Sequence, residues 1–334
     1  MKLKKEYILT LILIAGGAVL GVIIALSVKD KKAAEVPGSG VIISSWQGKG
    51  LAPEYYYDIE KFRAVDPKLI KWKETGEIKT KLKKVLGVSV SSSGEIAVCG
   101  EGGVETYGAD GKLREMFNPG DTVTSVYFGN NIIFSTREDV GVYTAGKTLW
   151  LLGKGAEGKL KLPLKHVSYV YAGNGWIYVA DSGQKKVYLY SAESKKVLEL
   201  KGNPKFIVPS PYLSVQVLDD EVYINNQGDH KIEKYSMDGK FISSFGKPGM
   251  DIESFSGCCN PVSFFVMTDG KVVTAEKGLP RIKIYGSNGK FLEVVAGPKS
   301  FDEGCIISLA GNDKKIYALD SVRKSVRIFE RKAN

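Results

Sequence analysis

Two cysteines stand side by side in the stretch SFSGCCNPVSFF, at positions 258 and 259. The chain contains only four cysteines, and the other two are Cys99 and Cys305. Neighbouring thiols can take part in a disulfide, hold a soft metal ion or exchange with other disulfides. They can also be small buried residues without any chemistry. The choice between these roles depends on the compartment and on the fold that positions the thiols.

The N-terminal region predicts that the rest of the chain is exported. Residues 7–28 are an uncharged, largely apolar run, long enough to cross a bilayer core of about 30 Å as a helix. Signal peptides have shorter apolar cores of about 7–15 residues, which favours an uncleaved anchor over a cleaved signal peptide. We predict a cytoplasmic tail at 1–6, a transmembrane anchor at 7–28, a linker at 29–50 and an extracytoplasmic body at 51–334. This single-pass cell-membrane protein would hold its cysteines where disulfides persist.

The charge of the chain is basic but is not arranged as in a nucleic-acid-binding protein. The net charge is +10, and no basic stripe interleaved with stacking aromatic residues is present. A mildly basic surface close to an anionic membrane accounts for the balance. No nucleic-acid partner is expected. The sequence also contains no G-x-S-x-G, P-loop or H-E-x-x-H motif.

The body is built from a repeated unit. Four segments align without gaps, and in each an apolar strand ends in an acid or an amide. The segments are YVADSGQKKVYLY, YINNQGDHKIEKY, VTAEKGLPRIKIY and YALDSVRKSVRIF. Their equivalent residues are Asp181, Asn226, Glu276 and Asp320, spaced by 45, 50 and 44 residues. Two weaker copies, with Gly100 and Thr136 at this position, bring the number of units to six.

Each unit predicts four short strands. Apolar and polar residues alternate, and the alternating runs are separated by Asp-Gly, Asn-Gly or Gly-Asn turns, which are hairpin signals. Four strands at a period of about 45 residues favour a β-propeller over a solenoid. The predicted fold is therefore an all-β, six-bladed β-propeller. Outside the strands, DIEKFRAV at 58–65 predicts a short helix.

Units three to six resemble NHL repeats. The resemblance lies in YVADSGQKKVYLY and NQGDHKIEKYSMDGKFISSFGKPG, where an apolar strand ends in Asp or an amide and leads through a turn and a basic residue to an I-x-x-F/Y-like strand. It covers about residues 166–330 and is weak in the first two units. Membership would imply six blades. It says little about function, because one fold hosts many activities.

The two ends of the body complement each other. The last unit stops at RIFERKAN without a fourth strand, whereas residues 66–81 resemble outer strands that lack inner ones. We therefore expect the N-terminal segment to supply the outer strand of the last blade and to close the ring.

Five residues are candidates for a binding site on one face of the ring. In a four-stranded blade, the start of the innermost strand and the turn between the second and third strands lie on the same face. The candidates are His166, Asp181, Asn226, Glu276 and Asp320. The favoured interpretation of the acids and the amide is structural, because such side chains hydrogen-bond to turn amides. The alternative is calcium or another divalent cation held in the channel.

The same alignment places the cysteines in one sector of the ring. Cys258 and Cys259 precede the inner strand of blade five, Cys305 precedes that of blade six, and Cys99 ends the second strand of blade one. A disulfide between Cys305 and one of the pair is favoured. A thiolate metal or electron-transfer site and inert buried thiols stay as alternatives.

Three functions follow from these features. The favoured one is a membrane-tethered module that binds a protein or a small ligand through its loop face. The second is a lyase- or lactonase-type propeller enzyme with a channel cation. The third is a thiol-redox or electron-transfer accessory protein that uses Cys258, Cys259 and Cys305. Because the chain has only two histidines, a binding function is favoured over an enzymatic one.

Overall fold

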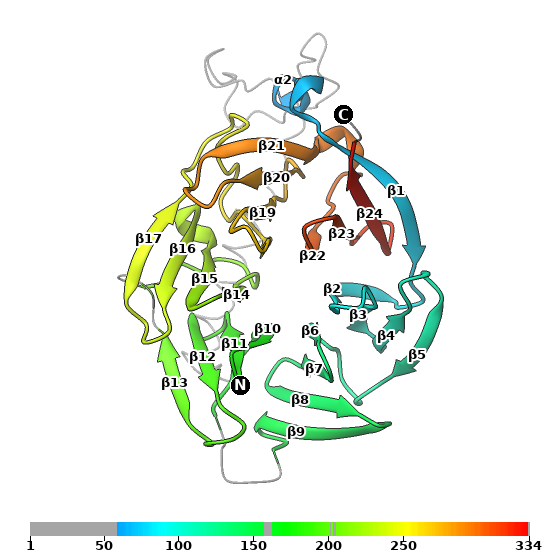
Figure 1. The fold of residues 1–334 in the computed structure, drawn as a ribbon, viewed down its shortest axis with the longest axis vertical. Helices are drawn as coiled ribbons and strands as arrows, with labels where there is room; N and C mark the ends of the chain where they lie inside the picture. The colour runs from blue at the N-terminus through cyan, green and yellow to red at the C-terminus, as the bar shows by residue number, and fades with distance from the viewer. Residues whose placement is uncertain (1–58, 157–161, 201, 203–204, 333–334) are drawn as a thin grey trace, which may run out of the picture. The chain divides into compact units, whose positions relative to one another are not determined.

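The described residues form a ring of six four-stranded sheets (Figure 1). The computed structural model describes residues 59–156, 162–200, 202 and 205–332. The predicted tail, anchor and linker at 1–50 lie outside these residues. Within the described part of the chain, no helix is both long and apolar enough to cross a membrane.

Every blade is an antiparallel sheet, and in five of the six the strands pair with their neighbours along the chain, whereas the sixth also includes β1 beside β24. Blade one contains β2 (Lys84–Val90), β3 (Ile96–Glu101), β4 (Gly103–Tyr107) and β5 (Leu113–Phe117). Blade two contains β6 (Ser125–Phe128), β7 (Ile132–Ser135), β8 (Asp139–Thr144) and β9 (Lys147–Gly153). Blade three contains β10 (Val167–Gly173), β11 (Trp176–Asp181), β12 (Lys186–Tyr190) and β13 (Val197–Leu200).

The second half of the ring repeats this arrangement. Blade four contains β14 (Val215–Leu218), β15 (Glu221–Asn226), β16 (Lys231–Ser236) and β17 (Phe241–Phe245). Blade five contains β18 (Ser263–Val266), β19 (Val272–Ala275), β20 (Ile282–Tyr285) and β21 (Phe291–Ala296). Blade six contains β22 (Ile307–Gly311), β23 (Lys315–Asp320), β24 (Ser325–Arg331) and β1 (Trp72–Lys79). The predictions of an all-β fold and six blades are confirmed.

The short non-strand elements lie before the first blade, between blades five and six, or, for one 3-10 turn, within blade four. The predicted helix in DIEKFRAV is present as α2 (Ile59–Arg63). Single 3-10 turns are η2 (Pro67–Leu69), η3 (Gln227–Asp229) and η4 (Pro298–Ser300). Among the hairpins, the Asp-Gly signal at 269–270 forms the β18–β19 turn, where Gly270 adopts a φ of 78°. Glycine reaches this conformation without a steric penalty.

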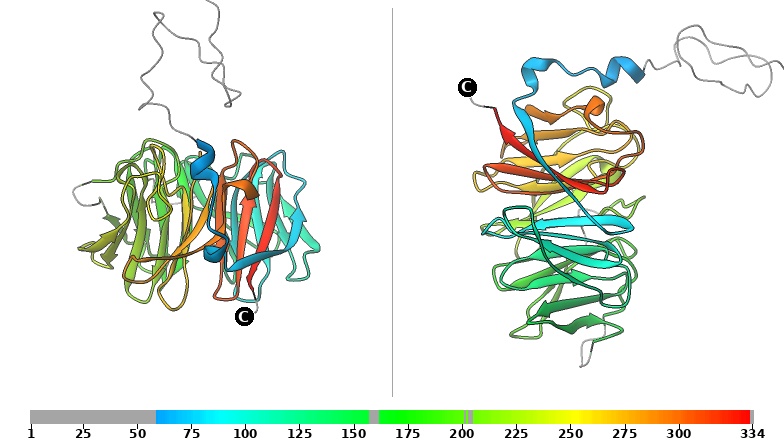
Figure 2. Two further views of the ribbon diagram at one scale, coloured as in Figure 1. Left: turned by 90° about the horizontal axis from the view of Figure 1, so that it is seen from above. Right: turned by 90° about the vertical axis from the view of Figure 1, so that its right-hand side faces the viewer.

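The N-terminal segment closes the ring. Strand β1 pairs antiparallel with β24, from Trp72 opposite Arg331 to Lys79 opposite Ser325, and the two strands lie side by side in Figures 1 and 2. The Arg327 guanidinium reinforces the pairing through an ion pair of 2.6 Å with Glu74. The outer strand of blade six therefore comes from the opposite end of the body, as the missing fourth strand predicts.

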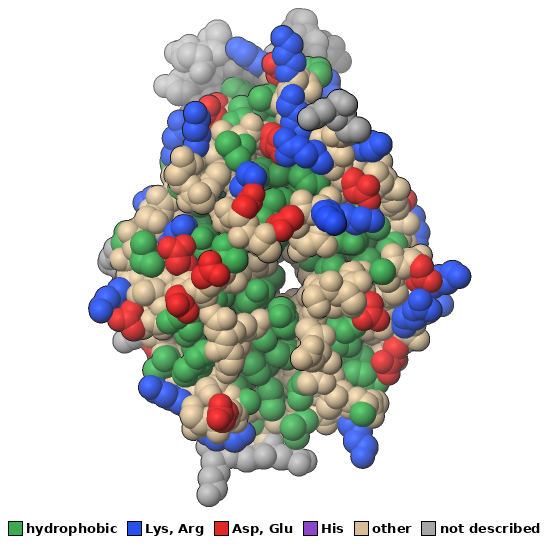
Figure 3. Space-filling view, viewed as in Figure 1, with side chains coloured by type: hydrophobic (Ala, Val, Ile, Leu, Met, Phe, Trp, Pro, Cys, Tyr) green, Lys and Arg blue, Asp and Glu red, His purple; other side chains and the backbone are tan. Residues whose placement is uncertain are grey.

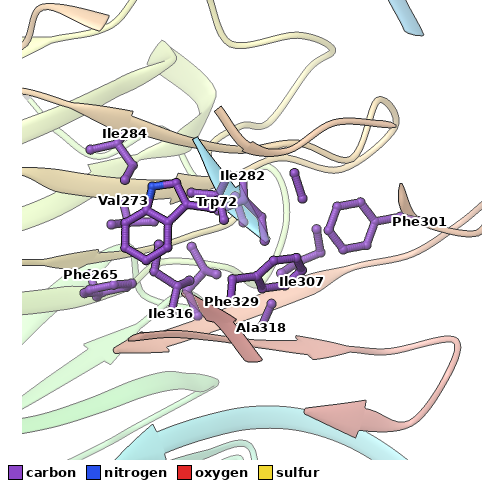
Figure 4. Close-up of a cluster of buried hydrophobic side chains, with 14 of the residues drawn as sticks. Trp72, Phe265, Val273, Ile282, Ile284, Phe301, Ile307, Ile316, Ala318 and Phe329 are labelled. Atoms are coloured by element: carbon purple, nitrogen blue, oxygen red, sulfur yellow. The ribbon is translucent and has the colours of Figure 1, made fainter. Parts of the chain in front are cut away.

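Hydrophobic clusters fill the spaces between neighbouring sheets. The largest lies between blades five and six and includes Trp72, Phe265, Ile282, Ile307 and Phe329 (Figure 4). Burying such side chains stabilises the fold by about 25 cal/mol per Å² of apolar surface. Because each cluster joins two blades, removing a blade would expose apolar surface on both of its neighbours.

Candidate functional site

A cavity of about 670 Å³ lies where the inner strands of all six blades meet. The space-filling view shows an opening at the centre of the ring (Figure 3). The residues that line the cavity include Lys84, Asp121, Arg137, His166, Ser168, Tyr212, Ser214, Ser263, Ile307 and Ser321. A second hollow of about 540 Å³ lies between β1 and the β4–β5 hairpin, where only blades six and one contribute residues. The first cavity is thus the one that the whole ring shapes.

The lining of the central cavity carries more positive than negative charge. Lys84 and Arg137 have no carboxylate partner within the described part of the chain, and Asp121 is the one acid among the lining residues. Burial, aided by the positive charge of Arg137, lowers the pKa of His166. The imidazole is therefore neutral at pH 7 and can accept or donate a hydrogen bond.

One polar group in the cavity wall has unused hydrogen-bonding capacity. The hydroxyl of Ser214 is buried, and no described residue bonds to it. Leaving a buried polar group unpaired costs about 1–3 kcal/mol. By contrast, the neighbouring hydroxyl of Ser168 donates to the carbonyls of Leu213, at 2.7 Å, and Ala180. Ser214 therefore lines the cavity, but its hydroxyl oxygen is shielded within the wall.

The acid and the amide of blades three and four are buried inside their own blades. Asp181 accepts hydrogen bonds from the backbone N–H groups of Lys165, His166 and Gln184. Asn226 accepts from the N–H of Ile207 and donates to Glu233. Each side chain therefore joins the turn after the second strand to the segment that leads into the first strand.

Blades five and six use charged partners for the same purpose. Glu276 accepts from the N–H of Ser256 and forms ion pairs of 2.7 Å with both Arg281 and Lys283. Asp320 accepts from the backbone N–H of Arg323 at 2.9 Å and lies 3.4 Å from the Arg327 guanidinium. All these groups are buried, which supports the structural interpretation. Of the five candidates, only His166 lines the cavity.

No metal cluster is evident in the described part of the chain, where no three His, Cys, Asp or Glu side chains are grouped to hold an ion. The carboxylates of Asp181, Glu276 and Asp320 do not line the channel cavity. The described residues therefore offer no convergent oxygen ligands of the kind that calcium uses.

Two of the four cysteines are buried apart from the pair. Cys99 packs between blades one and two, and burial raises its pKa far above the usual range. The Cys305 thiol lies near the carbonyl of Ile306, and burial, together with the nearby Asp320, raises its pKa to about 12. All four cysteines are free thiols in the structure. The predicted bridge from Cys305 is therefore not present in the structure.

Cys258 and Cys259 are in direct contact. Their Sγ atoms are 3.2 Å apart, and they lie in the loop that leads into β18. The second histidine, His230, is hydrogen-bonded through Nε2 to the carbonyl of Gly257 at 2.7 Å, next to the pair. His230 thus helps to hold the loop rather than the cavity.

Comparison with known proteins identifies the fold. No family model matches the sequence, and no curated protein matches it. A structural genomics protein of unknown function from Bacteroides thetaiotaomicron VPI-5482 is 12% identical, with a TM-score of 0.55 over 78% of this chain and 73% of that chain. Selenomethionine-substituted virginiamycin B lyase from Staphylococcus aureus is 14% identical, with a TM-score of 0.51 over 78% of this chain and 99% of that chain. The chain is a six-bladed β-propeller. At these identities the likeness shows the fold alone.

The position after each of these strand-ending residues is a better sequence signal for the channel than the strand-ending residues themselves. In several blades, the residue that directly follows this strand-ending position lies beside the channel. Arg137, after Thr136, and Ser321, after Asp320, line the cavity, and Lys277, after Glu276, bonds to Ser210 near its rim. Side chains alternate in direction along an extended chain. When the strand-ending side chain is buried inside the blade, the side chain of the next residue therefore points out of the blade and toward the channel.

Proposed function

We propose that this propeller is a binding module whose central cavity takes a small anionic ligand. The observation that carries the proposal is the cavity itself, which six blades enclose and which holds Lys84 and Arg137 without carboxylate partners among the described residues. Its volume of about 670 Å³ falls within the usual range of about 300–1,000 Å³ for small-molecule sites.

The chemistry of the lining supports an acidic ligand. A guanidinium binds a carboxylate or phosphate through two parallel hydrogen bonds. The neutral imidazole of His166 adds an uncharged polar contact. Val85, Val262 and Ile307 supply apolar surface for the rest of the ligand. Apolar surface combined with polar groups that orient the ligand is typical of ligand sites.

A binding function is better supported than the lyase- or lactonase-type alternative. That alternative rests on analogy of fold, which does not determine chemistry. A channel cation would need the carboxylates of Asp181, Glu276 and Asp320 to converge, and these are occupied by hydrogen bonds and ion pairs inside the blades.

Thermal unfolding with anions of known structure tests the proposal. We expect at least one of citrate, succinate and glucose 6-phosphate to raise the Tm of the full-length protein, whereas glucose does not. A ligand at about 100 times its Kd stabilises the folded state by about 2.7 kcal/mol, which corresponds to several degrees of Tm. The substitution Arg137→Ala should weaken the affinity roughly ten- to hundredfold, since a hydrogen bond to a charged group contributes about 1.5–3 kcal/mol.

Arg114→Ala is the matched control for this experiment. It removes the same side chain from the exposed outer strand β5, where Arg114 pairs with Asp110. The control should bind the anion as the native protein does. The proposal fails if no anion raises Tm, or if the two Arg variants respond equally.

The proposal includes a location, in which residues 7–28 anchor the propeller to the membrane on its extracytoplasmic side. The uncharged run of spanning length supports it. We expect the full-length chain to stay with membranes after alkaline carbonate extraction, whereas a chain that begins at residue 29 should be released. Release of the full-length chain would contradict the anchor.

A further inference from the structure

The cysteine pair combines an accessible thiol with a shielded one. The side chain of Cys258 is exposed, whereas only 1% of Cys259 is exposed. Their Sγ atoms are already 3.2 Å apart, and a disulfide bond is about 2.05 Å long. A movement of little more than an ångström would therefore join them.

The surroundings of Cys259 favour its thiolate. Its Sγ lies 3.1 Å from the hydroxyl of Ser210, and this hydroxyl accepts a hydrogen bond of 3.2 Å from the ammonium of Lys277. Burial opposes ionisation, but the hydrogen bonds and the positive charge of Lys277 outweigh it and lower the pKa of Cys259. The hydrogen bond with Cys259 in turn raises the pKa of Cys258. The pair thus favours a state with one thiolate, on Cys259, and one thiol, on Cys258, with a single proton between the two sulfur atoms.

We propose that Cys258 and Cys259 are a dithiol–disulfide exchange site, which closes reversibly to a vicinal disulfide when a low-molecular-weight disulfide acts as the oxidant. The site draws on the loop before β18, on Lys277 after β19 and on Ser210 before β14. It is independent of the anionic ligand of the central cavity, because it needs none of that ligand's proposed contacts.

The exchange balances in two steps. Cys258 attacks one sulfur of the oxidant, its proton passes to the adjacent Cys259 sulfur, and the first thiolate leaves. Cys259 gives up this proton to that thiolate and then attacks the Cys258 sulfur of the mixed disulfide, which displaces the second thiolate. Cys259 enters the reaction as a thiolate, so its own proton is already in solvent. The second leaving thiolate takes up that proton. Overall, the two protein thiols lose two electrons and two protons, and the oxidant becomes two free thiols.

Reversibility follows from the geometry of adjacent residues. Consecutive Cα atoms are about 3.8 Å apart, which is less than the 4.4–6.8 Å that unstrained disulfides span. Strained and exposed disulfides are the more easily reduced ones. A bridge between Cys258 and Cys259 should therefore open again in a mildly reducing thiol buffer.

Equilibration of the full-length protein with glutathione buffers tests the proposal. After alkylation and digestion, we expect the peptide that carries both cysteines to lose two hydrogens and both alkyl groups as the oxidised fraction rises. The change should reverse when reduced glutathione is restored. Two alkylated thiols across the whole range, or a bridge from either residue to Cys99 or Cys305, would overturn the proposal.

Three variants separate this chemistry from accidental oxidation. In Cys259→Ser, glutathione should accumulate on Cys258, because no resolving thiol is left. In Lys277→Met, the pH profile of the exchange rate should move upward, with about a tenfold slower reaction at pH 7 for each unit by which the pKa of Cys259 rises. Cys305→Ala is the control and should behave as the native protein. An unchanged pH profile in Lys277→Met, or no glutathione adduct in Cys259→Ser, would contradict the site.

Discussion

Replacing Glu276 by Gln is expected to destabilise the protein by about 3–5 kcal/mol, the typical cost of removing one partner from a buried ion pair. Glu276 is fully buried, and the side chains of Arg281 and Lys283 beside it are 1% and 0% exposed. Without the carboxylate, two cations would stay in a low-dielectric interior, where backbone carbonyls and the aromatic rings beside Lys283 cannot neutralise their charge. Equilibrium unfolding in urea should show the loss, together with a Tm lower by roughly 10 °C.

A matched exposed pair provides the control. Glu330 and Lys315 form an ion pair of 2.8 Å on the surface of blade six, with 37% and 45% of their side chains exposed. Surface pairs of this kind contribute about 0–1 kcal/mol, and Glu330→Gln should change stability by no more than that. Equal losses in the two variants would show that burial of the Glu276 network is not what makes it important.

The effect of Glu276→Gln should also depend on pH. Burial lowers the pKa of Lys283 to about 8 in the folded protein, whereas an unfolded lysine titrates near pH 10.4. Between these values the unfolded state binds more protons, so the contribution of Lys283 to stability rises with pH across this window. Above about pH 8 the native protein also loses the Lys283–Glu276 attraction. The difference between variant and native protein should therefore be smaller at pH 9 than at pH 7, and a pH-independent difference would contradict this account.

The fold could be predicted because its signals are local and repeated. The hairpin turns and the spacing of Asp181, Asn226, Glu276 and Asp320 recur in the sequence, and each copy reinforces the others. Closure by β1 was also predictable, since the last unit lacks a strand and the first segment has one to spare. Both features depend on counting strands, which alternating patterns allow.

The channel lining could not be predicted with the same security. Strand alternation predicts which side chains share a face, but a β-bulge changes that alternation. Register shifts occur in two inner strands at the channel, between Val167 and Tyr169 and between Val85 and Gly87. These irregularities are properties of the assembled ring. The sequence analysis therefore found His166 but not Lys84, Arg137 or Ser214.

The cysteines show a similar limit. Alignment placed Cys258, Cys259 and Cys305 correctly before the inner strands of blades five and six. It could not predict orientation, because Cys305 turns toward Asp320 of its own blade, whereas Cys259 contacts Ser210 of blade four. Residues in equivalent positions of adjacent blades are related by rotation about the ring axis, and rotation does not bring their side chains together.

Replacing Trp72 by Ala should be the second strongly destabilising change, with an expected loss of about 3–5 kcal/mol. Trp72 begins β1 and is 3% exposed. Its ring packs among residues of blades five and six (Figure 4), and its Nε1 donates a hydrogen bond of 2.9 Å to Glu293 of β21. The side chain thus attaches the N-terminal strand to the blade before the last as well as to the last blade.

Trp176→Ala distinguishes the closure of the ring from the burial of an indole. Trp176 begins β11 of blade three, is only partly buried and packs against the cluster between blades three and four, which are consecutive along the chain. Removing the Trp176 indole should lower the free energy of unfolding less than removing that of Trp72, and urea unfolding of the two variants measures the difference.

Ring closure by Trp72 also has a local consequence. Amide hydrogen exchange in β1 and β24 should speed up in Trp72→Ala, while exchange in blade three stays native, because local opening follows the contacts that are lost. Equal costs, or faster exchange spread evenly over all blades, would mean that Trp72 acts as one more core residue. A larger loss of stability in Trp72→Ala, with faster exchange confined to β1 and β24, would mean that this indole holds together the two ends of the chain that complete blade six.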